Sequence, residues 1–202
     1  VTVSRGGLTV MESYGPRFHD GTVENARWAD LTVAFAVDFT SPGERLTATA
    51  AGEDYLPFDL PHSGEELEDE GLRRRMATIL ARRLESRADP VRLNVAGSTA
   101  ADLSRHGISQ EQADAFVTDV LGRAVDEGLR IQELRTGGQS GIDEAGTKAA
   151  LALGIPASQV VPRGFLYLDE SGKPHWNRDS FFSRFDGISP YERGEDFDVG
   201  EA

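Results

Sequence analysis

The chain has 202 residues, 39% of them hydrophobic and 27% charged, which is typical of one globular domain with a substantial core. It has no cysteine, which excludes disulfides, thiolate catalysis and cysteine-bound metals, and its formal net charge of −13 disfavours nucleic acid and anionic membranes as partners. No apolar run approaches a membrane span and no leader pattern opens the chain, so a cytoplasmic location is expected.

Residue periodicity divides the chain into alternating strands and helices, after a weakly patterned segment at residues 1–20. In chain order the predicted elements are a strand at 31–37, a helix at 42–51, a strand at 55–60, a helix at 64–89, a strand at 91–97, a helix at 110–127, a strand at 130–134, a helix at 145–153, a strand with its loop at 160–164 and a short helix at 180–185. This alternation predicts an α/β fold: one three-layer Rossmann-like domain over residues 21–190, with a mostly parallel sheet. Residues 191–202 are an acidic tail that we expect to be mobile.

Capping residues set the predicted starts of three helices. Thr40 or Ser41 suits the N-cap before Pro42, because proline is favoured at the first helical position. Ser63 and Ser109 each stand three residues before a glutamate or glutamine, which is the spacing of a capping box. The helix predicted after Ser63 places six apolar residues on one stripe: Leu67, Leu72, Met76, Ile79, Leu80 and Leu84.

The most informative motif is Gly-Gly-Gln-Ser-Gly-Ile-Asp at residues 137–143, between a predicted strand and a predicted helix. Glycines let the backbone approach a ligand, and the first N–H groups of a helix have no internal partner. A strand, glycine turn and helix in this order are typical of sites for polar, often phosphorylated, small molecules. Two glycines followed by Gln-Ser-Gly exceed the needs of a tight turn, so ligand contact is favoured over a purely structural role.

Three glycine-containing loops are predicted to end strands at one edge of the sheet: residues 38–44, 97–99 and 136–143. Ligands of open α/β sheets bind outside the carboxyl ends of the strands, so we expect a binding site where these loops meet. The predicted ligand-binding residues are Asp38, Thr40, Ser41, Gly43, Asn94, Gly97, Ser98, Thr136, Gly137, Gly138, Gln139, Ser140, Asp143 and Arg163.

Several of these residues also have a structural interpretation. Asp143 in a first helical turn complements the helix dipole, and together with Glu144 it would oppose a phosphate at that helix end. Either Asp143 accepts a ribose hydroxyl, or the bound group is not highly charged. Arg135 and Arg163 are the cations nearest the predicted edge, and each suits an anionic ligand or a surface ion pair. The four histidines lack metal-ligand spacing, so no metal site is expected.

The glycine motif and three other segments resemble one family. Residues 137–156 resemble the Gly-Gly-Gln-Thr-Gly-x-Asp region of molybdenum-cofactor-carrier-like proteins, in the SLOG branch of Rossmann-like folds. Val-Pro-Arg-Gly at 161–164 resembles the strand end that follows there, and Leu-Asn-Val-Ala-Gly at 93–97 resembles a segment near that family's C-terminus. Residues 30–47 resemble its strand and Gly-Gly-Thr helix start. Because the two halves are exchanged, the chain looks circularly permuted.

This resemblance implies a protein that binds or senses a nucleotide or nucleotide-like ligand of ADP-ribose or pterin-nucleotide type, the molybdopterin class included, as a homodimer or larger homo-oligomer. An alternative is an N-glycosidic hydrolase similar to the LOG phosphoribohydrolases, with Asp143, Glu44 and Asp38 as candidate catalytic acids. Those enzymes use a glutamate further along the helix than Glu44, where this chain has no acid. The third hypothesis is a structural or partner-binding domain with a vestigial pocket. A deep pocket with two carboxylates would favour the hydrolase.

Overall fold

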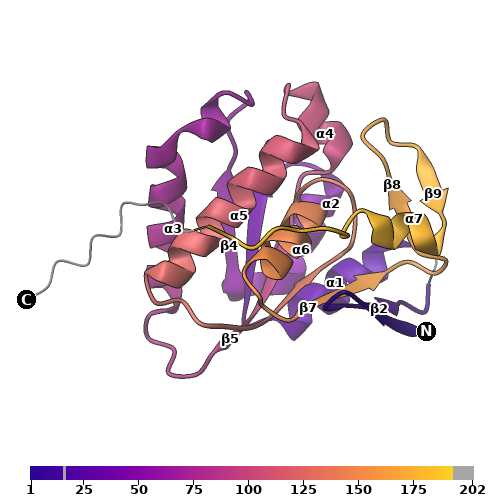
Figure 1. Cartoon of the computed structure of the whole chain (residues 1–202), viewed down its shortest axis with the longest axis horizontal. Helices are drawn as coiled ribbons and strands as arrows, with labels where there is room; N and C mark the ends of the chain where they lie inside the picture. Colours follow the sequence, from indigo (N-terminus) through magenta and orange to yellow (C-terminus); the bar gives the residue numbers. More distant parts are fainter. Residues whose placement is uncertain (16, 193–202) are drawn as a thin grey trace, which may run out of the picture.

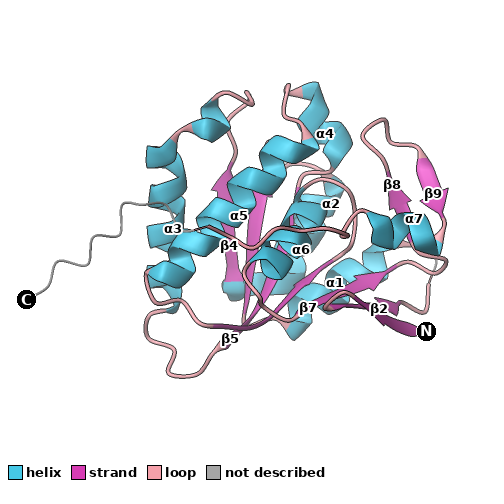
Figure 2. Cartoon of the chain, viewed as in Figure 1, coloured by secondary structure: helices cyan, strands magenta, loops and turns pink. Residues whose placement is uncertain are grey.

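The apolar run that begins at Leu31 forms strand β3 (Leu31–Ala36), and all six of its residues are buried. In the computed structural model, which describes residues 1–15 and 17–192, six further strands join β3: β1 (Thr2–Arg5), β2 (Leu8–Glu12), β4 (Tyr55–Asp59), β5 (Val91–Gly97), β6 (Ile131–Thr136) and β7 (Ala157–Val161). The order in this sheet is β1-β2-β7-β6-β5-β3-β4, and every neighbouring pair is parallel except β1 with β2. Figure 2 shows strands of this sheet in magenta among the cyan helices.

Helices cover both faces of the sheet (Figure 1). On one face, α1 (Phe18–Trp28) packs against α2 (Pro42–Ala51). On the other face, α5 (Gln110–Asp126) packs against both α3 (Glu70–Leu84) and α6 (Ile142–Ala152). This is the three-layer Rossmann-like arrangement predicted from the sequence, with strands 31–37, 91–97 and 130–136 parallel in one sheet.

The strand order reverses at β3. The chain passes from β3 to β4 on one side, and then returns to the other side of β3 with β5, β6 and β7. Right-handed crossovers therefore put α2 on one face of the sheet, while α3, α5 and α6 lie on the other. The crevice between the carboxyl ends of β3 and β5 is the topological switch point, which is where such sheets bind ligands.

Aromatic packing ties the switch strand to its neighbours. Phe35 on β3 stacks on Phe58 of β4 with ring centroids 5.4 Å apart, and it meets Phe116 of α5 edge-on at 6.0 Å. Each such side chain contributes about 1.5–3 kcal/mol through burial of apolar surface. The carboxyl end of β3 therefore has a fixed position relative to β4 and α5.

Two predicted helix starts are confirmed. The Ser41 side chain accepts a hydrogen bond from the Glu44 N–H at 3.2 Å, and Pro42 follows it as the first residue of α2. At α5, Ser109 and Gln112 exchange both bonds of a capping box. These starts could be predicted because the signals are local and lie next to an apolar stripe.

The helix predicted to start after Ser63 is wrong at its beginning. Residues Glu66–Glu68 form a single 3₁₀ turn, and α3 starts at Glu70, because the Asp69 side chain accepts from the Leu72 N–H at 3.1 Å. Leu67 is buried from the 3₁₀ turn rather than from the helical stripe. Ile79, expected on that stripe, is 49% exposed.

No element is predicted for residues 1–20, yet they form β1, β2 and the first turn of α1. These strands extend the sheet beyond β7, and a boundary after residue 20 would cut α1. The buried residues of α1 are Gly21, Asn25 and Ala26, so it lacks the apolar stripe that reveals other helices. Shorter elements complete the described part: 3₁₀ turn η1 (Gly52–Asp54), α4 (Ala100–Arg105), the hairpin of β8 (Leu166–Leu168) and β9 (Pro174–Trp176), and α7 (Arg178–Ser183).

The acidic tail predicted at residues 191–202 falls outside the described residues except for its first two. Within the described ranges, no helix has the length and apolar character needed to cross a membrane.

Candidate functional site

A cavity of about 320 Å³ lies at the topological switch point. All three predicted loops contribute to its wall, which confirms that they converge on one edge of the sheet, and α1 lies on another side. The predicted ligand-binding residues that line it are Ser41, Gly43, Asn94, Gly97, Gly137, Gln139 and Asp143, and the candidate catalytic acid Glu44 lines it as well.

Three of the predicted residues lie beneath the loops instead. Ser98 is buried and accepts a hydrogen bond from the backbone N–H at the end of β3, at 3.0 Å. Thr136 is buried and accepts from the Gly138 N–H at 3.2 Å. Ser140 donates to the Leu168 carbonyl oxygen. These hydroxyl groups hold the loops in shape and do not line the cavity.

Three other predicted residues lie at the protein surface. Asp38 is exposed and accepts from both the N–H and the hydroxyl group of Thr40, each at 2.7 Å, which closes a small turn outside the cavity. Arg163 is also exposed, on the loop that follows β7. None of these three side chains lines the cavity.

Gly138 also faces away from the cavity. Its φ of +75° is a conformation that favours glycine, and a Cβ atom there would lie 2.5 Å from Cγ1 of Val161 and 3.2 Å from Cζ of Phe181. A side chain at this position would therefore disturb the core first, so a substitution at Gly138 reports on stability.

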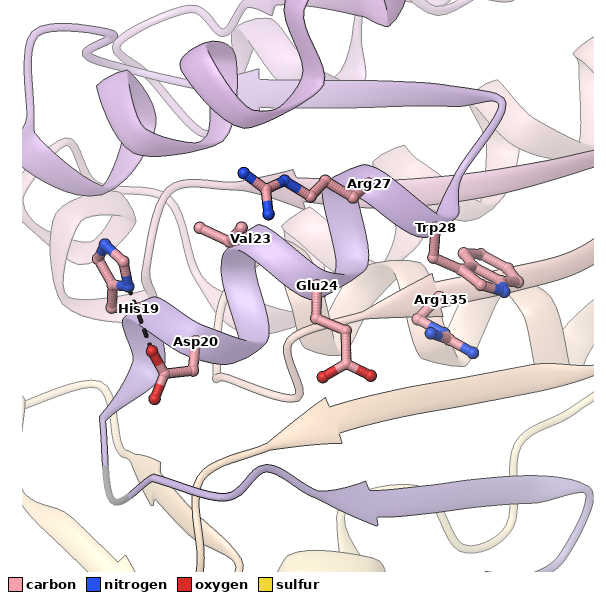
Figure 3. A pocket seen from close by; sticks show the side chains of 7 residues that line it. All are labelled: His19, Asp20, Val23, Glu24, Arg27, Trp28 and Arg135. Carbon is pink, nitrogen blue, oxygen red and sulfur yellow. Dashed lines mark hydrogen bonds and ion pairs between the residues drawn. The ribbon is translucent and has the colours of Figure 1, made fainter.

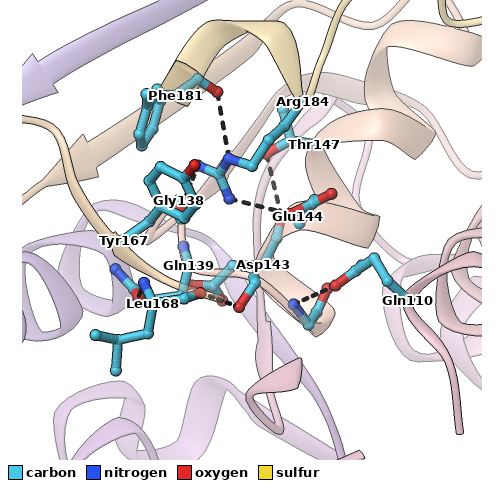
Figure 4. A network of polar contacts seen from close by, with 12 residues as sticks. Gln110, Gly138, Gln139, Asp143, Glu144, Thr147, Tyr167, Leu168, Phe181 and Arg184 are labelled. Carbon is cyan, nitrogen blue, oxygen red and sulfur yellow. Dashed lines mark hydrogen bonds and ion pairs between the residues drawn. The ribbon is translucent and has the colours of Figure 1, made fainter. Parts of the chain in front are cut away.

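Gly137 shows why the turn needs a second glycine. A Cβ atom on Gly137 would lie only 2.6 Å from Oδ2 of Asp143. Without a side chain, the turn wraps around this carboxylate, which accepts from the N–H groups of Gly137 and Gln139, the latter at 3.3 Å (Figure 4). The glycine turn thus holds an acid at the cavity.

Glu44 is a second acid at the cavity, in the first turn of α2. Its side chain is buried, and its Oε2 atom has no hydrogen-bond partner in the described part of the chain. Burial raises the pKa of Glu44 to about 7, and the negative charges of Asp143, Asp102 and Asp38 add to this shift.

Burial also raises the pKa of Asp143 to about 7, against the opposing effects of its two backbone N–H bonds and of the Arg184 charge. Near neutral pH this pair of carboxyl groups is therefore partly protonated. Such a pair provides a hydrogen-bond donor and an acceptor in one cavity.

No described residue that lines the cavity is Arg, Lys or His. Arg135, one of the two cations expected near the edge, lies in a separate, more open hollow of about 550 Å³ beside α1 (Figure 3). Its guanidinium group stacks 4.0 Å from the ring centroid of Trp28 and donates to Ser158 at 3.1 Å. Any anion in the cavity therefore depends on neutral donors, which are backbone N–H groups and the hydroxyl and amide groups of lining side chains.

Three lining residues from α1 were missed by the sequence analysis: Phe18, Thr22 and Asn25. Their spacing of four and three residues places them on one helical face. That spacing is the only sequence signal for them, and it has meaning only once α1 is known to be a helix.

The turn is held from behind by a polar network (Figure 4). The Gln139 side chain donates to the Leu166 carbonyl oxygen at 3.3 Å and accepts from the Leu168 N–H at 3.2 Å. Arg184 donates to the Gly138 carbonyl oxygen at 2.9 Å and to Glu144 at 3.0 Å. The hairpin and α7 therefore support the cavity wall, although neither was predicted as part of the site.

Comparisons of the chain with protein-family models, with curated proteins and with solved structures found no match. Among residues 1–15 and 17–192, no three His, Asp or Glu side chains are grouped so that they could hold a metal ion. The polar side chains that line the cavity offer carboxyl, amide and hydroxyl groups.

Proposed function

We propose that the protein binds a nucleotide-like small molecule, of ADP-ribose or pterin-nucleotide type, with its ribose beside Glu44 and Asp143. The observation that carries this proposal is that two of the three acids that line the cavity, Glu44 and Asp143, have pKa values near 7, and that no described cationic side chain lines it. A carboxyl group removed from water without a partner is costly, and Glu44 Oε2 is in that state. Ribose hydroxyl groups would supply the missing hydrogen bonds.

The start of α2 provides a place for the ligand's phosphate. Ser41 and Gly43 line the cavity at this helix start, where backbone N–H groups and the helix dipole favour anions. Glu44 in the same turn opposes a phosphate only when it is ionised, and its raised pKa limits that opposition near neutral pH.

The resemblance of residues 137–156 to molybdenum-cofactor-carrier-like proteins supports the same ligand class. It also supports placing the chain in the SLOG branch in permuted order, and it is the reason to include a homo-oligomer in the proposal. The Rossmann-like sheet and the position of the glycine turn at the switch point are consistent with that assignment.

A second candidate function, hydrolysis of the ligand's N-glycosidic bond, is favoured by one specific observation. Two carboxyl groups whose pKa values are near 7 line one cavity. The ionised one would take a proton from water as its oxygen bonds to C1′, and the protonated one would give a proton to the departing base nitrogen. With AMP as the substrate, ribose 5-phosphate and adenine would be the products.

Calorimetric titration with ADP-ribose and AMP tests binding. We expect the wild-type protein to bind one of these probes and Asp143→Asn to bind it about 10- to 100-fold more weakly, the effect of one charged hydrogen bond. Asp59→Asn removes an exposed acid at the end of β4 and should leave the affinity unchanged. Chromatography of the mixtures for released base tests hydrolysis. A folded wild-type protein that binds neither probe contradicts the proposal.

A further inference from the structure

The amide of Asn25 is buried without a partner. Asn25 is 2% exposed, and its Oδ1 atom is buried without a hydrogen-bond partner among the described residues. An unpaired buried amide costs about 1–3 kcal/mol. Asn94, the other buried asparagine of the cavity wall, differs because its Nδ2 atom donates to Thr32 at 3.2 Å.

Asn25 lies where a ligand held by Asp143 would be. It lines the cavity from the third turn of α1. Its Nδ2 atom is 3.9 Å from the point at which a side chain on Gly137 would begin, and Oδ2 of Asp143 is 2.6 Å from the same point. The amide and the carboxylate therefore flank Gly137, and a ligand that contacts this turn meets both groups.

The combination of amide and carboxyl groups selects for hydroxyl groups. An amide offers both a donor and an acceptor, and a hydroxyl group can satisfy either end while it also donates to a carboxylate. A phosphate only accepts hydrogen bonds, so it would leave an amide oxygen unpaired and add negative charge beside Glu44 and Asp143. A pair of neighbouring hydroxyl groups, as in ribose, satisfies all of these side chains together.

We infer that Asn25 is a specificity-determining residue that binds the ribose 2′- and 3′-hydroxyl groups and makes the cavity select ribonucleotides over 2′-deoxyribonucleotides. This inference rests on the proposed function, because it places the ribose beside Asp143. It adds a ligand contact from α1, which lies outside the three predicted loops. It also narrows the ligand to molecules with a free vicinal diol.

Calorimetry with AMP and GMP, each paired with its 2′-deoxy counterpart, measures this selectivity. We expect the wild-type protein to prefer at least one ribonucleotide by tenfold or more, since a site built to bind a hydroxyl group rejects the analogue that lacks it, by about 10⁴- to 10⁵-fold in the strongest cases. In Asn25→Leu the ribonucleotide affinity should fall about tenfold and the preference should shrink.

Thermal unfolding without ligand separates a binding role from a structural one. Asn25→Leu replaces an unpaired amide by an apolar group with the same branching and number of heavy atoms, so its Tm should equal or exceed that of the wild type. Asn94→Leu is the matched control: it leaves the buried Thr32 hydroxyl without its partner, and its Tm should fall.

Each result has one meaning. If Asn25→Leu loses as much stability as Asn94→Leu, or keeps the wild-type preference for ribonucleotides, the inference is overturned and the proposed function stands. A wild-type protein that binds AMP or GMP and their 2′-deoxy forms equally also overturns it. If the wild type binds none of the probes, ADP-ribose included, the proposed function fails and the inference fails with it.

Discussion

The pKa values of Glu44 and Asp143 are both raised above those of exposed acids, and burial at the cavity is the main cause in each case. The pKa of Glu44 is 4.5 in an exposed setting and about 7 here. Between these two values the folded protein keeps a proton that the unfolded chain has released. The free energy of unfolding therefore falls as the pH rises through this window, and the loss is complete above about pH 7.

Glu44→Gln tests this linkage, because glutamine has a similar shape and cannot ionise. Relative to the wild type, we expect the variant to gain about 2 kcal/mol of unfolding free energy between pH 5 and pH 8, less than the full pKa shift because water reaches the cavity. Urea unfolding at the two pH values measures the difference. Glu53→Gln, at an exposed position, serves as the control and should show no such gain. An equal effect of Glu44→Gln at both pH values would show that Glu44 does not titrate in this range.

At this scale, the sequence predicts which loops form the site better than which side chains enter it. Asn94 and Gly137 line the cavity, whereas Ser98 and Thr136, close to them in sequence, lie beneath the loops. The difference depends on how each loop leaves its strand, which residue type does not encode. Asn25 was missed because a helix with polar and glycine residues on its buried face shows no apolar period.

Among the elements, α7 and the β8–β9 hairpin have the clearest effect on the site. Arg184, just after α7, stacks 4.0 Å from the ring centroid of Tyr167 and 4.5 Å from that of Phe181. It joins the Gly138 carbonyl oxygen to Glu144, whose other oxygen lies 2.7 Å from Lys148. The buried guanidinium group of Arg184 therefore connects the segment that follows α7 to the glycine turn.

Arg184→Gln should be strongly destabilising, since it leaves Glu144 buried with one partner fewer. Its side chain is 11% exposed and that of Glu144 is 7% exposed, and breaking such a pair costs about 3 kcal/mol. Arg5→Gln is the matched control: it breaks the exposed pair of Arg5 and Asp186 and should cost less than about 1 kcal/mol. Denaturant midpoints of the two variants measure both effects. Similar losses in the two variants would contradict the role assigned to Arg184.

Element boundaries could be predicted where one capping signal dominates. Ser109 caps α5 as expected, and Ser41 rather than the neighbouring Thr40 caps α2, because Ser41 directly precedes Pro42 at the first helical position. Ser63 does not cap α3; Asp69 does so instead, because its side chain is an equally good cap and lies closer to the apolar stripe of the helix. The short helix predicted at 180–185 is present as α7, two residues earlier, whereas the hairpin was harder to predict because its short strands pack on the glycine turn rather than on a long apolar face.

For the whole molecule, the parallel sheet could be predicted because β3 and β5 have largely apolar sequences and because β3, β5 and β6 alternate with helices. The same pattern located the cavity, since strand-end loops in a parallel sheet share one edge. The extension of the sheet by β1 and β2 could not be predicted in this way, because β1 is an exposed edge strand with little apolar sequence.

The net charge of −13 gives a last prediction for the whole molecule. Repulsion among excess carboxylates destabilises the compact state, and salt screens it, with a Debye length of about 10 Å at 0.1 M and 3 Å at 1 M. We therefore expect the Tm at pH 7.5 to rise by several degrees as NaCl increases from about 0.02 to 0.5 M, because screening of this repulsion outweighs the weakening of surface ion pairs.

The same titration at pH 5 is the control, because the isoelectric point is near 4.7 and the net charge there is small. At that pH, screening has little repulsion to remove, so the Tm should stay constant or fall slightly as surface ion pairs weaken. Scanning calorimetry at both pH values measures the two slopes. Equal increases would mean that salt acts through the hydration of apolar surface, and that the surplus of acids costs the folded state little.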